Sequence, residues 1–207
     1  MTFTNIDQLW SSLWTPRFSN EDIRLRFELG GEEFDNTTQQ VPRFLQAHHR
    51  ASVVADTLFR ESCIAVVAWN GRQPNSLGLP KVKNGFDALQ STGFEAPQIS
   101  EWQDELYPPD ADDDEAYQYT LRSYDIAGNK AARDTILWHS IAAEMPIYPC
   151  APVVAFLINP VTPVMLHVYE DRGMDIIADD PASISEIYSA FADWLLDYDR
   201  ERMEQLF

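Results

Sequence analysis

Apolar residues recur at helical or strand spacing through the first third of the chain. Residues 6–14 place Ile, Leu and Trp on one helical face, and residues 22–29 alternate strictly between apolar and polar, as a half-buried strand does. Helical spacing returns over 45–59, and the apolar run 63–69 follows it. The pattern therefore predicts helix, strand, helix and then a central strand.

The middle of the chain is less regular. Residues 70–85 are rich in Gly, Pro, Asn and Ser, which predicts a long loop, and a short helix is expected to begin near Phe86. The acidic stretch 95–115 contains Tyr-Pro-Pro-Asp, which interrupts regular structure, so we expect this stretch to be exposed and irregular. Alternation at 117–121 then predicts a strand, and the composition of 130–145 predicts a helix.

Three short apolar runs, 153–158, 164–169 and 174–178, have brief connections that predict an antiparallel meander. A long amphipathic helix should follow, with Asp180 as its N-cap and Pro181 at its first position. Helices and strands do not alternate as in parallel-sheet proteins. The sequence therefore predicts one α+β domain over 1–207, with a mostly antiparallel sheet and helices packed on it.

Charge separates the two parts of the chain. Residues 1–94 contain 10 acidic and 9 basic residues, whereas 95–207 contain 23 acidic and 6 basic, and the whole chain has a formal net charge of −18. Such a charge disfavours nucleic acid and anionic lipid as partners. The sequence begins without a secretory pattern, and its longest apolar stretch is too short to span a membrane. We therefore expect a cytoplasmic protein with no membrane partner, in which both cysteines are reduced.

Common catalytic and metal-binding motifs are absent from the sequence. Gly30-Gly31 is followed by two glutamates that would repel a phosphate, and there is no G-x-S-x-G, H-E-x-x-H or C-x-x-C pattern. Spatial pairing of Cys150 with a histidine stays open, because the sequence does not show proximity. We predict no metal ion and no cofactor, and the sequence identifies no catalytic residue.

The densest polar cluster between strands is Glu-Asp-Arg-Gly-Met-Asp at 170–175. One interpretation is a hairpin turn in which Arg172 pairs internally with a carboxylate. The alternative is acid–base chemistry at a centre formed by Asp171, Arg172 and Asp175, with His167 as a further candidate.

This cluster begins a pair of longer motifs, Y-x-D-R-G-M-D at 169–175 and W-x-x-D-Y-D-R at 194–200. Together with L-R-F-E-L-G-G at 25–31, they resemble a bacterial family of domains of unknown function, and the resemblance covers nearly the whole chain. It implies a bacterial, intracellular setting but no mechanism. The motif residues that we single out are Asp171, Arg172, Gly173, Asp175, Trp194, Tyr198 and Asp199.

Small acidic bacterial domains without catalytic motifs are frequently immunity proteins. Our first hypothesis is an immunity or antitoxin-type protein that neutralises a cognate basic toxin domain, with a nuclease as one candidate, through an acidic surface. The expected contacts are the acidic cluster and its flanking tyrosines: Tyr107, Asp110, Asp112, Asp113, Asp114, Glu115 and Tyr117. The alternatives are a small hydrolase or transferase that uses Asp171, Arg172 and Asp175, and a structural or regulatory module of a larger assembly.

Overall fold

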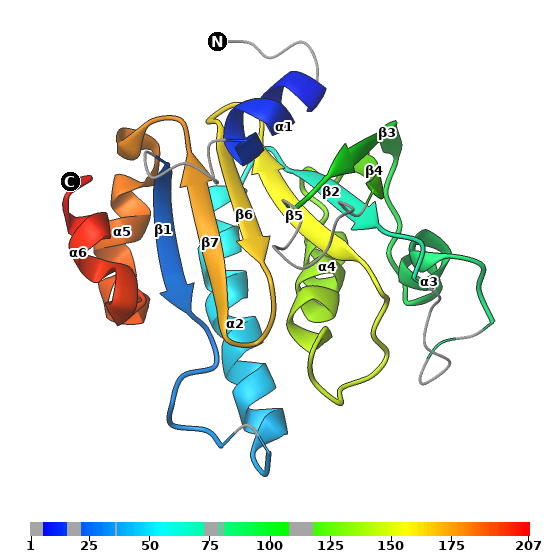
Figure 1. Ribbon diagram of the computed structural model, residues 1–207, viewed down its shortest axis with the longest axis horizontal. Helices are drawn as coiled ribbons and strands as arrows, with labels where there is room; N and C mark the ends of the chain where they lie inside the picture. The colour runs from blue at the N-terminus through cyan, green and yellow to red at the C-terminus, as the bar shows by residue number, and fades with distance from the viewer. Residues whose placement is uncertain (1–5, 16–21, 36, 73–78, 80, 108–117) are drawn as a thin grey trace.

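The computed structural model describes residues 6–15, 22–35, 37–72, 79, 81–107 and 118–207 (Figure 1). In chain order its elements are α1 (Ile6–Trp14), β1 (Ile23–Glu28), α2 (Gln40–Leu58), β2 (Ile64–Trp69), α3 (Gly85–Ser91), β3 (Gln98–Glu105), β4 (Gln118–Asp125), α4 (Lys130–Ala142), β5 (Val154–Asn159), β6 (Val164–Val168), β7 (Gly173–Ala178), α5 (Ser185–Ala190) and α6 (Arg200–Glu204). Short 3-10 turns lie at Pro181–Ile184, Ala192–Trp194 and Asp197–Asp199.

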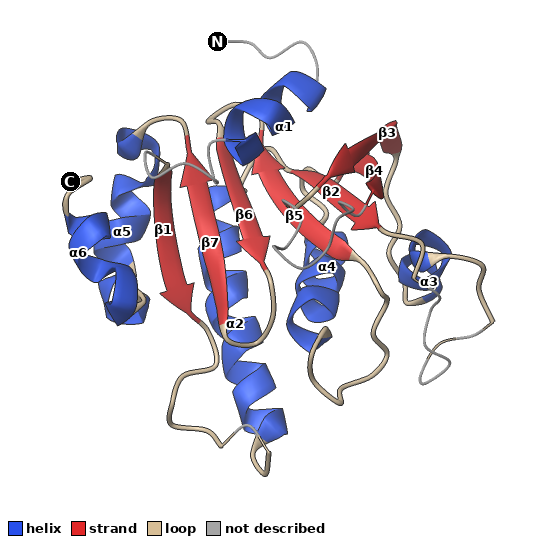
Figure 2. Cartoon of the chain, viewed as in Figure 1, coloured by secondary structure: helices blue, strands red, loops and turns tan. Residues whose placement is uncertain are grey.

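The described strands form one seven-stranded sheet in the order β1-β7-β6-β5-β2-β4-β3 (Figure 2). Each neighbouring pair is antiparallel. The structure therefore confirms the α+β class, the central position of β2 and the β5–β6–β7 meander. The short connections leave no room for a parallel crossover within the meander.

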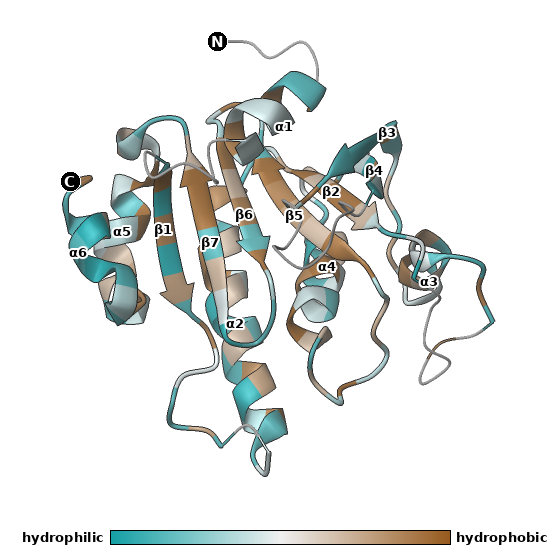
Figure 3. Ribbon diagram, in the orientation of Figure 1, coloured by the Kyte–Doolittle hydropathy of each residue, from teal (hydrophilic) through white to brown (hydrophobic). Residues whose placement is uncertain are grey.

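Helices cover both faces of the sheet, and the buried strands between them are the most hydrophobic part of the fold (Figure 3). On one face, α2 and α4 pack on the sheet with a core that includes Val67, Leu157 and Ile176. On the other face, α1 buries Trp10 and Trp14 against Phe156, with ring centroids 4.9 and 4.7 Å from it. Edge-to-face contacts of this kind add to the hydrophobic burial that anchors α1.

The two edges of the sheet differ. At β1, Leu195 forms a backbone bridge with Phe27, and the N–H of Leu196 donates to the carbonyl of Arg26 at 2.9 Å. The Arg202 guanidinium also donates to the backbone carbonyl of Arg24 at 3.1 Å. The C-terminal segment therefore closes this edge. Within the described residues, β3 pairs only with β4 and forms the opposite edge.

The prediction that the acidic stretch 95–115 is irregular was wrong for its first part. This part contains the strand β3. Trp102 packs edge-on against Trp10 at 6.1 Å, and Asp104 accepts a hydrogen bond from the Trp10 indole at 2.8 Å. An edge strand needs apolar contact along one side only, so acidic residues on its other side conceal the strand pattern.

The meander is followed by helical structure, as predicted, and Asp180 caps the first turn by accepting from the N–H of Ala182 at 2.9 Å. The single apolar stripe, however, is divided into α5, α6 and the 3-10 turns. Leu195 and Leu196 are extended, with ψ of 136° and 118°. A continuous helix is impossible here because these two residues pair with the backbone of β1.

Candidate functional site

The polar cluster at 170–175 spans the turn between β6 and β7 and the first residues of β7, and all three of its acidic residues are buried. Glu170, Asp171 and Asp175 are 5, 8 and 2% exposed. A buried carboxylate needs compensating charge or hydrogen bonds. In this turn each carboxylate receives them from a different arginine or pair of arginines.

Asp171 pairs with Arg43, which α2 brings to the turn. The Arg43 guanidinium also donates to the carbonyl of Gly31 at 2.6 Å. A Cβ atom at Gly30 would lie 2.6 Å from the guanidinium carbon, so a larger residue there would force the Arg43 side chain to shift. The ion pair therefore joins the Gly-Gly loop, α2 and the turn.

Asp175 belongs to a second set of charges, on the face of the sheet that carries α1. Its carboxylate lies 3.3 Å from Arg26 Nε and 3.5 Å from an Nη atom of Arg24. Asp199 continues the network, 3.7 Å from Arg26 and 3.0 Å from Arg202. Although burial opposes it, hydrogen bonding and the positive charge of these arginines hold the pKa of Asp199 below its ordinary value.

Glu170 forms the third set with Arg172 and Glu144. Arg172 pairs with Glu170 and lies 3.6 Å from the Glu144 carboxylate. Burial raises the pKa of Glu170, and Glu144 raises it further, while Arg172 acts in the opposite direction. Arg172 thus pairs internally, as the turn interpretation predicted.

Gly173 is required by close packing at the start of β7. A Cβ atom there would lie 2.9 Å from the Phe27 carbonyl oxygen and closer still to the Tyr169 hydroxyl. The remaining motif residues are more exposed. Trp194 stacks on Phe191 at 5.1 Å beneath the Arg50 guanidinium, whereas Tyr198 is 88% exposed. The structure therefore assigns Asp171, Arg172 and Asp175 to separate ion-pair sets.

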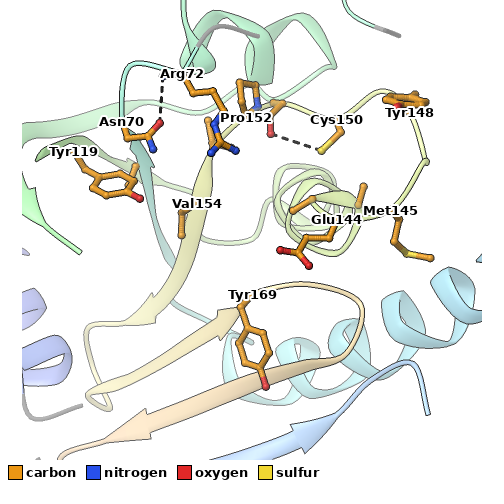
Figure 4. Close-up of a pocket in the computed structure, with 15 residues that line it drawn as sticks. Asn70, Arg72, Tyr119, Glu144, Met145, Tyr148, Cys150, Pro152, Val154 and Tyr169 are labelled. Carbon is orange, nitrogen blue, oxygen red and sulfur yellow. Dashed lines mark hydrogen bonds between the residues drawn. The ribbon is translucent and has the colours of Figure 1, made fainter. Parts of the chain in front are cut away.

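Two cavities adjoin this turn. One has a volume of about 440 Å³, and its polar lining side chains are Asn70, Arg72, Tyr119, Glu144, Tyr148, Cys150 and Tyr169 (Figure 4). The other, of about 220 Å³, is lined by Arg43, Glu170, Asp171 and Arg172 among others, and shares Glu144 and Met145 with the first. Sequence reasoning missed the cavity residues Arg72 and Glu144, and the only signal was an arginine inside a predicted long loop.

His139 and Cys150 are neighbours, but they do not form a thiolate–imidazole pair. His139 Nδ1 accepts from the N–H of Ala151 at 3.0 Å, and its Nε2 contacts the Thr92 hydroxyl at 2.7 Å. Burial lowers the pKa of His139 to about 4 and raises that of Cys150 to about 11. The imidazole is therefore a neutral structural group whose two nitrogens are both engaged.

His167, the further candidate of the acid–base alternative, is 1% exposed on the α1 face of the sheet. Its ring lies 4.4 Å from that of Phe156 and 5.6 Å from that of Trp14. Across the described part of the chain, no three His, Cys, Asp or Glu residues are arranged to hold a metal ion.

Most of the predicted partner contacts, Asp110, Asp112, Asp113, Asp114, Glu115 and Tyr117, lie outside the described residues. Tyr107 is described, is 37% exposed and lies 6.2 Å from the Trp14 ring. The acidic character continues onto β3, where Glu101 and Glu105 are exposed. Glu101 pairs with Arg122 at 2.7 Å, and Glu105 accepts from Gln118 at 2.7 Å.

The fold and the ion-paired turn define an α+β protein built on a seven-stranded antiparallel sheet. The chain belongs to the family described as Domain of unknown function (DUF3885), whose model matches residues 3–199. Neither the curated proteins nor the solved structures contain a match to it. No helix in the described ranges combines the length and apolarity needed to cross a membrane.

Proposed function

We propose that this chain is an immunity-type binding protein of the bacterial cytoplasm that neutralises a cognate basic toxin domain through an acidic surface. The observation that carries the proposal is the asymmetry of the sheet. The C-terminal segment closes the β1 edge, whereas β3 is an edge strand whose exposed side chains include Glu101 and Glu105.

An acidic edge strand suits a basic partner for two physical reasons. Its outer backbone groups can pair with an extended segment, and its carboxylates favour a segment that carries lysine or arginine. The long-range field of a chain with a net charge of −18 also accelerates encounter with a cation.

The acidic residues at 110–115 follow β3 closely in sequence and add to the negative charge of this part of the chain. Tyr107 stands between them and the strand in the sequence and is 37% exposed, so a partner that covers it would desolvate it. Charge provides rate and orientation, and a buried aromatic anchor provides much of the affinity of protein interfaces. Tyr107 is the described residue that we propose for this role.

The acidic residues of the 170–175 turn are not part of the proposed interface. They are buried, unlike Glu101 and Glu105, and arginines neutralise them within the fold. A hydrolase or transferase centred on Asp171, Arg172 and Asp175 has less support, because the three side chains belong to separate ion-pair sets.

The test is a pull-down with the tagged protein from lysate of its source bacterium at low and high salt, followed by expression of any retained basic protein with and without this chain. We expect the partner to be toxic alone and harmless with its inhibitor. Replacing Asp112, Asp113 and Asp114 by Asn, or Glu101 and Glu105 by Gln, should slow association and reduce its salt dependence.

The control is the double variant Glu32→Gln, Glu33→Gln, which removes two exposed charges away from β3. It should leave the association rate close to that of the wild type. A retained partner that is harmless by itself, or the absence of any basic partner at either salt concentration, would refute the proposal.

A further inference from the structure

We infer that the cavity of about 440 Å³ is a binding site for a small zwitterion, an α-amino acid with an apolar or aromatic side chain. Its volume lies within the roughly 300–1,000 Å³ of typical small-molecule sites. The inference is independent of the proposed toxin binding, because the cavity lining includes neither Glu101 nor Glu105.

Four separate segments converge on the cavity. Asn70 and Arg72 follow β2, Tyr119 lies in β4, and Tyr169 follows β6. Residues 142–152, after α4, and the beginning of β5 complete the lining. Figure 4 shows the Arg72 guanidinium, the Tyr119 hydroxyl and the Glu144 carboxylate turned toward the same space.

Arg72 supplies the positive wall. Its backbone is fixed on both sides, because its N–H donates to Asn70 Oδ1 at 3.2 Å and its carbonyl accepts from the Trp69 indole at 2.7 Å. No carboxylate of the described chain lies within ion-pairing distance of its guanidinium. A guanidinium in this state can bind a carboxylate through two parallel hydrogen bonds.

Glu144 supplies the negative wall. Its ion pair with Arg172 spans 3.6 Å between side chains that are each 69% exposed, and such a pair contributes little. The carboxylate can therefore accept hydrogen bonds from an ammonium group. A ligand held between Glu144 and Arg72 needs a cationic donor that faces Glu144 and a carboxylate that faces Arg72, and an α-amino acid carries both groups on its α-carbon.

The remaining lining residues determine which kind of ligand side chain fits the cavity. Met145, Tyr148, Pro152, Val153 and Val154 provide apolar and aromatic surface beside the two charges. A hydrophobic or aromatic side chain would bury area against them, whereas an acidic side chain would face Glu144.

The 170–175 turn supports this cavity. The Tyr169 side chain lines it, Gly173 packs against the Tyr169 hydroxyl, and the nearby Tyr169 contributes to raising the pKa of Arg26. Asp175 in turn fixes Arg26 at 3.3 Å. Part of the family motif thus positions one wall of the proposed site.

The experiment is a calorimetric and NMR titration of the full chain with L-phenylalanine and L-leucine. Two probes remove one charge each: N-acetyl-L-phenylalanine lacks the ammonium, and L-phenylalaninamide lacks the carboxylate. We expect both analogues to bind at least about tenfold more weakly than L-phenylalanine, since each leaves one charged wall unpaired. Failure of both amino acids to bind at millimolar concentration would overturn the inference.

Two variants locate the site. Arg72→Gln should weaken L-phenylalanine binding at least about tenfold, and Glu144→Gln should abolish the preference for L-phenylalanine over its N-acetyl analogue. Arg60→Gln and Glu61→Gln are matched controls, because both residues are exposed and neither lines the cavity. Undiminished binding to Arg72→Gln, or equal weakening by the controls, would contradict the placement.

Discussion

Arg43 and Asp171 form an ion pair in which each side chain is 11% exposed. The two residues are 128 positions apart in the chain. Their contact joins α2 to the turn between β6 and β7, and Gly30 packs directly on the guanidinium. The ion pair is therefore a tertiary contact that cannot be predicted from the sequence around either residue.

Arg43→Ala should destabilise the fold by about 3–5 kcal/mol, because it leaves the Asp171 carboxylate buried without its counterion. Urea unfolding gives the free energy of unfolding directly. The double variant Arg43→Met, Asp171→Leu should recover most of the loss, since no isolated charge remains. A double variant less stable than Arg43→Ala would contradict this account.

Gly173→Ala should cost about 2 kcal/mol or more, because the new methyl group has no space beside Tyr169 and the Phe27 carbonyl. Adding Tyr169→Phe removes the nearest atom and should restore part of the stability. Thermal unfolding of the single and double variants provides the comparison. If the single and double variants have the same melting temperature, the tyrosine hydroxyl is not the group that clashes with the new methyl group.

Acidification should destabilise the protein through His139. Its folded-state pKa of about 4 lies below the unfolded value of 6.5, so the unfolded state takes up the proton first as pH falls. The stabilising contribution is complete above about pH 6.5, and about 2 kcal/mol of it is lost by about pH 5. Urea unfolding across this range should show the loss in the wild type and a smaller one in His139→Gln. If wild type and His139→Gln lost the same free energy of unfolding between these pH values, His139 would be excluded as the cause of the acid destabilisation.

Met203→Ala should cost about 2–5 kcal/mol although residue 203 lies beyond the family match, because its side chain is 0% exposed. Its sulfur also accepts from the N–H of Arg26 at 3.1 Å. Tyr198→Ala, within the match but 88% exposed, should change stability by less than about 0.5 kcal/mol. Chemical denaturation of both variants measures the two losses of stability. A larger loss for Tyr198→Ala than for Met203→Ala would refute the described packing of the C-terminal segment.

The elements with strong periodicity were predictable from sequence. Residues 23–28 alternate because β1 lies between a core face and a polar face, and the apolar residues of α1 share one stripe because a single face is buried. The meander was predictable because its connections are short. In each case the local pattern and the tertiary environment agree.

The sequence predictions are wrong where tertiary contacts override the local preference for helix, strand or loop. The acidic residues of β3 concealed the strand, whose burial depends on Trp10, a residue far earlier in the chain. Leu195 and Leu196 fit a helical stripe, but backbone pairing with β1 makes them extended. Neither outcome can be obtained from a short sequence window.

The 170–175 cluster was found in the sequence, and Arg172 pairs with an acid two residues away, as a local argument can anticipate. The partners of Asp175 could not be found in this way, because Arg26 lies 149 positions away. For the same reason Arg72 and Glu144 had no visible relationship until the fold placed them on one cavity.

The pairing of β1 with β7 also has a kinetic consequence. Ile23 lies opposite Ala178, so the first described strand finds its neighbour only after nearly the whole chain has been synthesised. Local hairpins such as β5–β6 and β6–β7 need short loop closures and should form early, whereas β1 must wait. During translation β1 therefore lacks its hydrogen-bonding neighbour until the meander has left the ribosome, and over that interval its backbone groups are open to incorrect pairing.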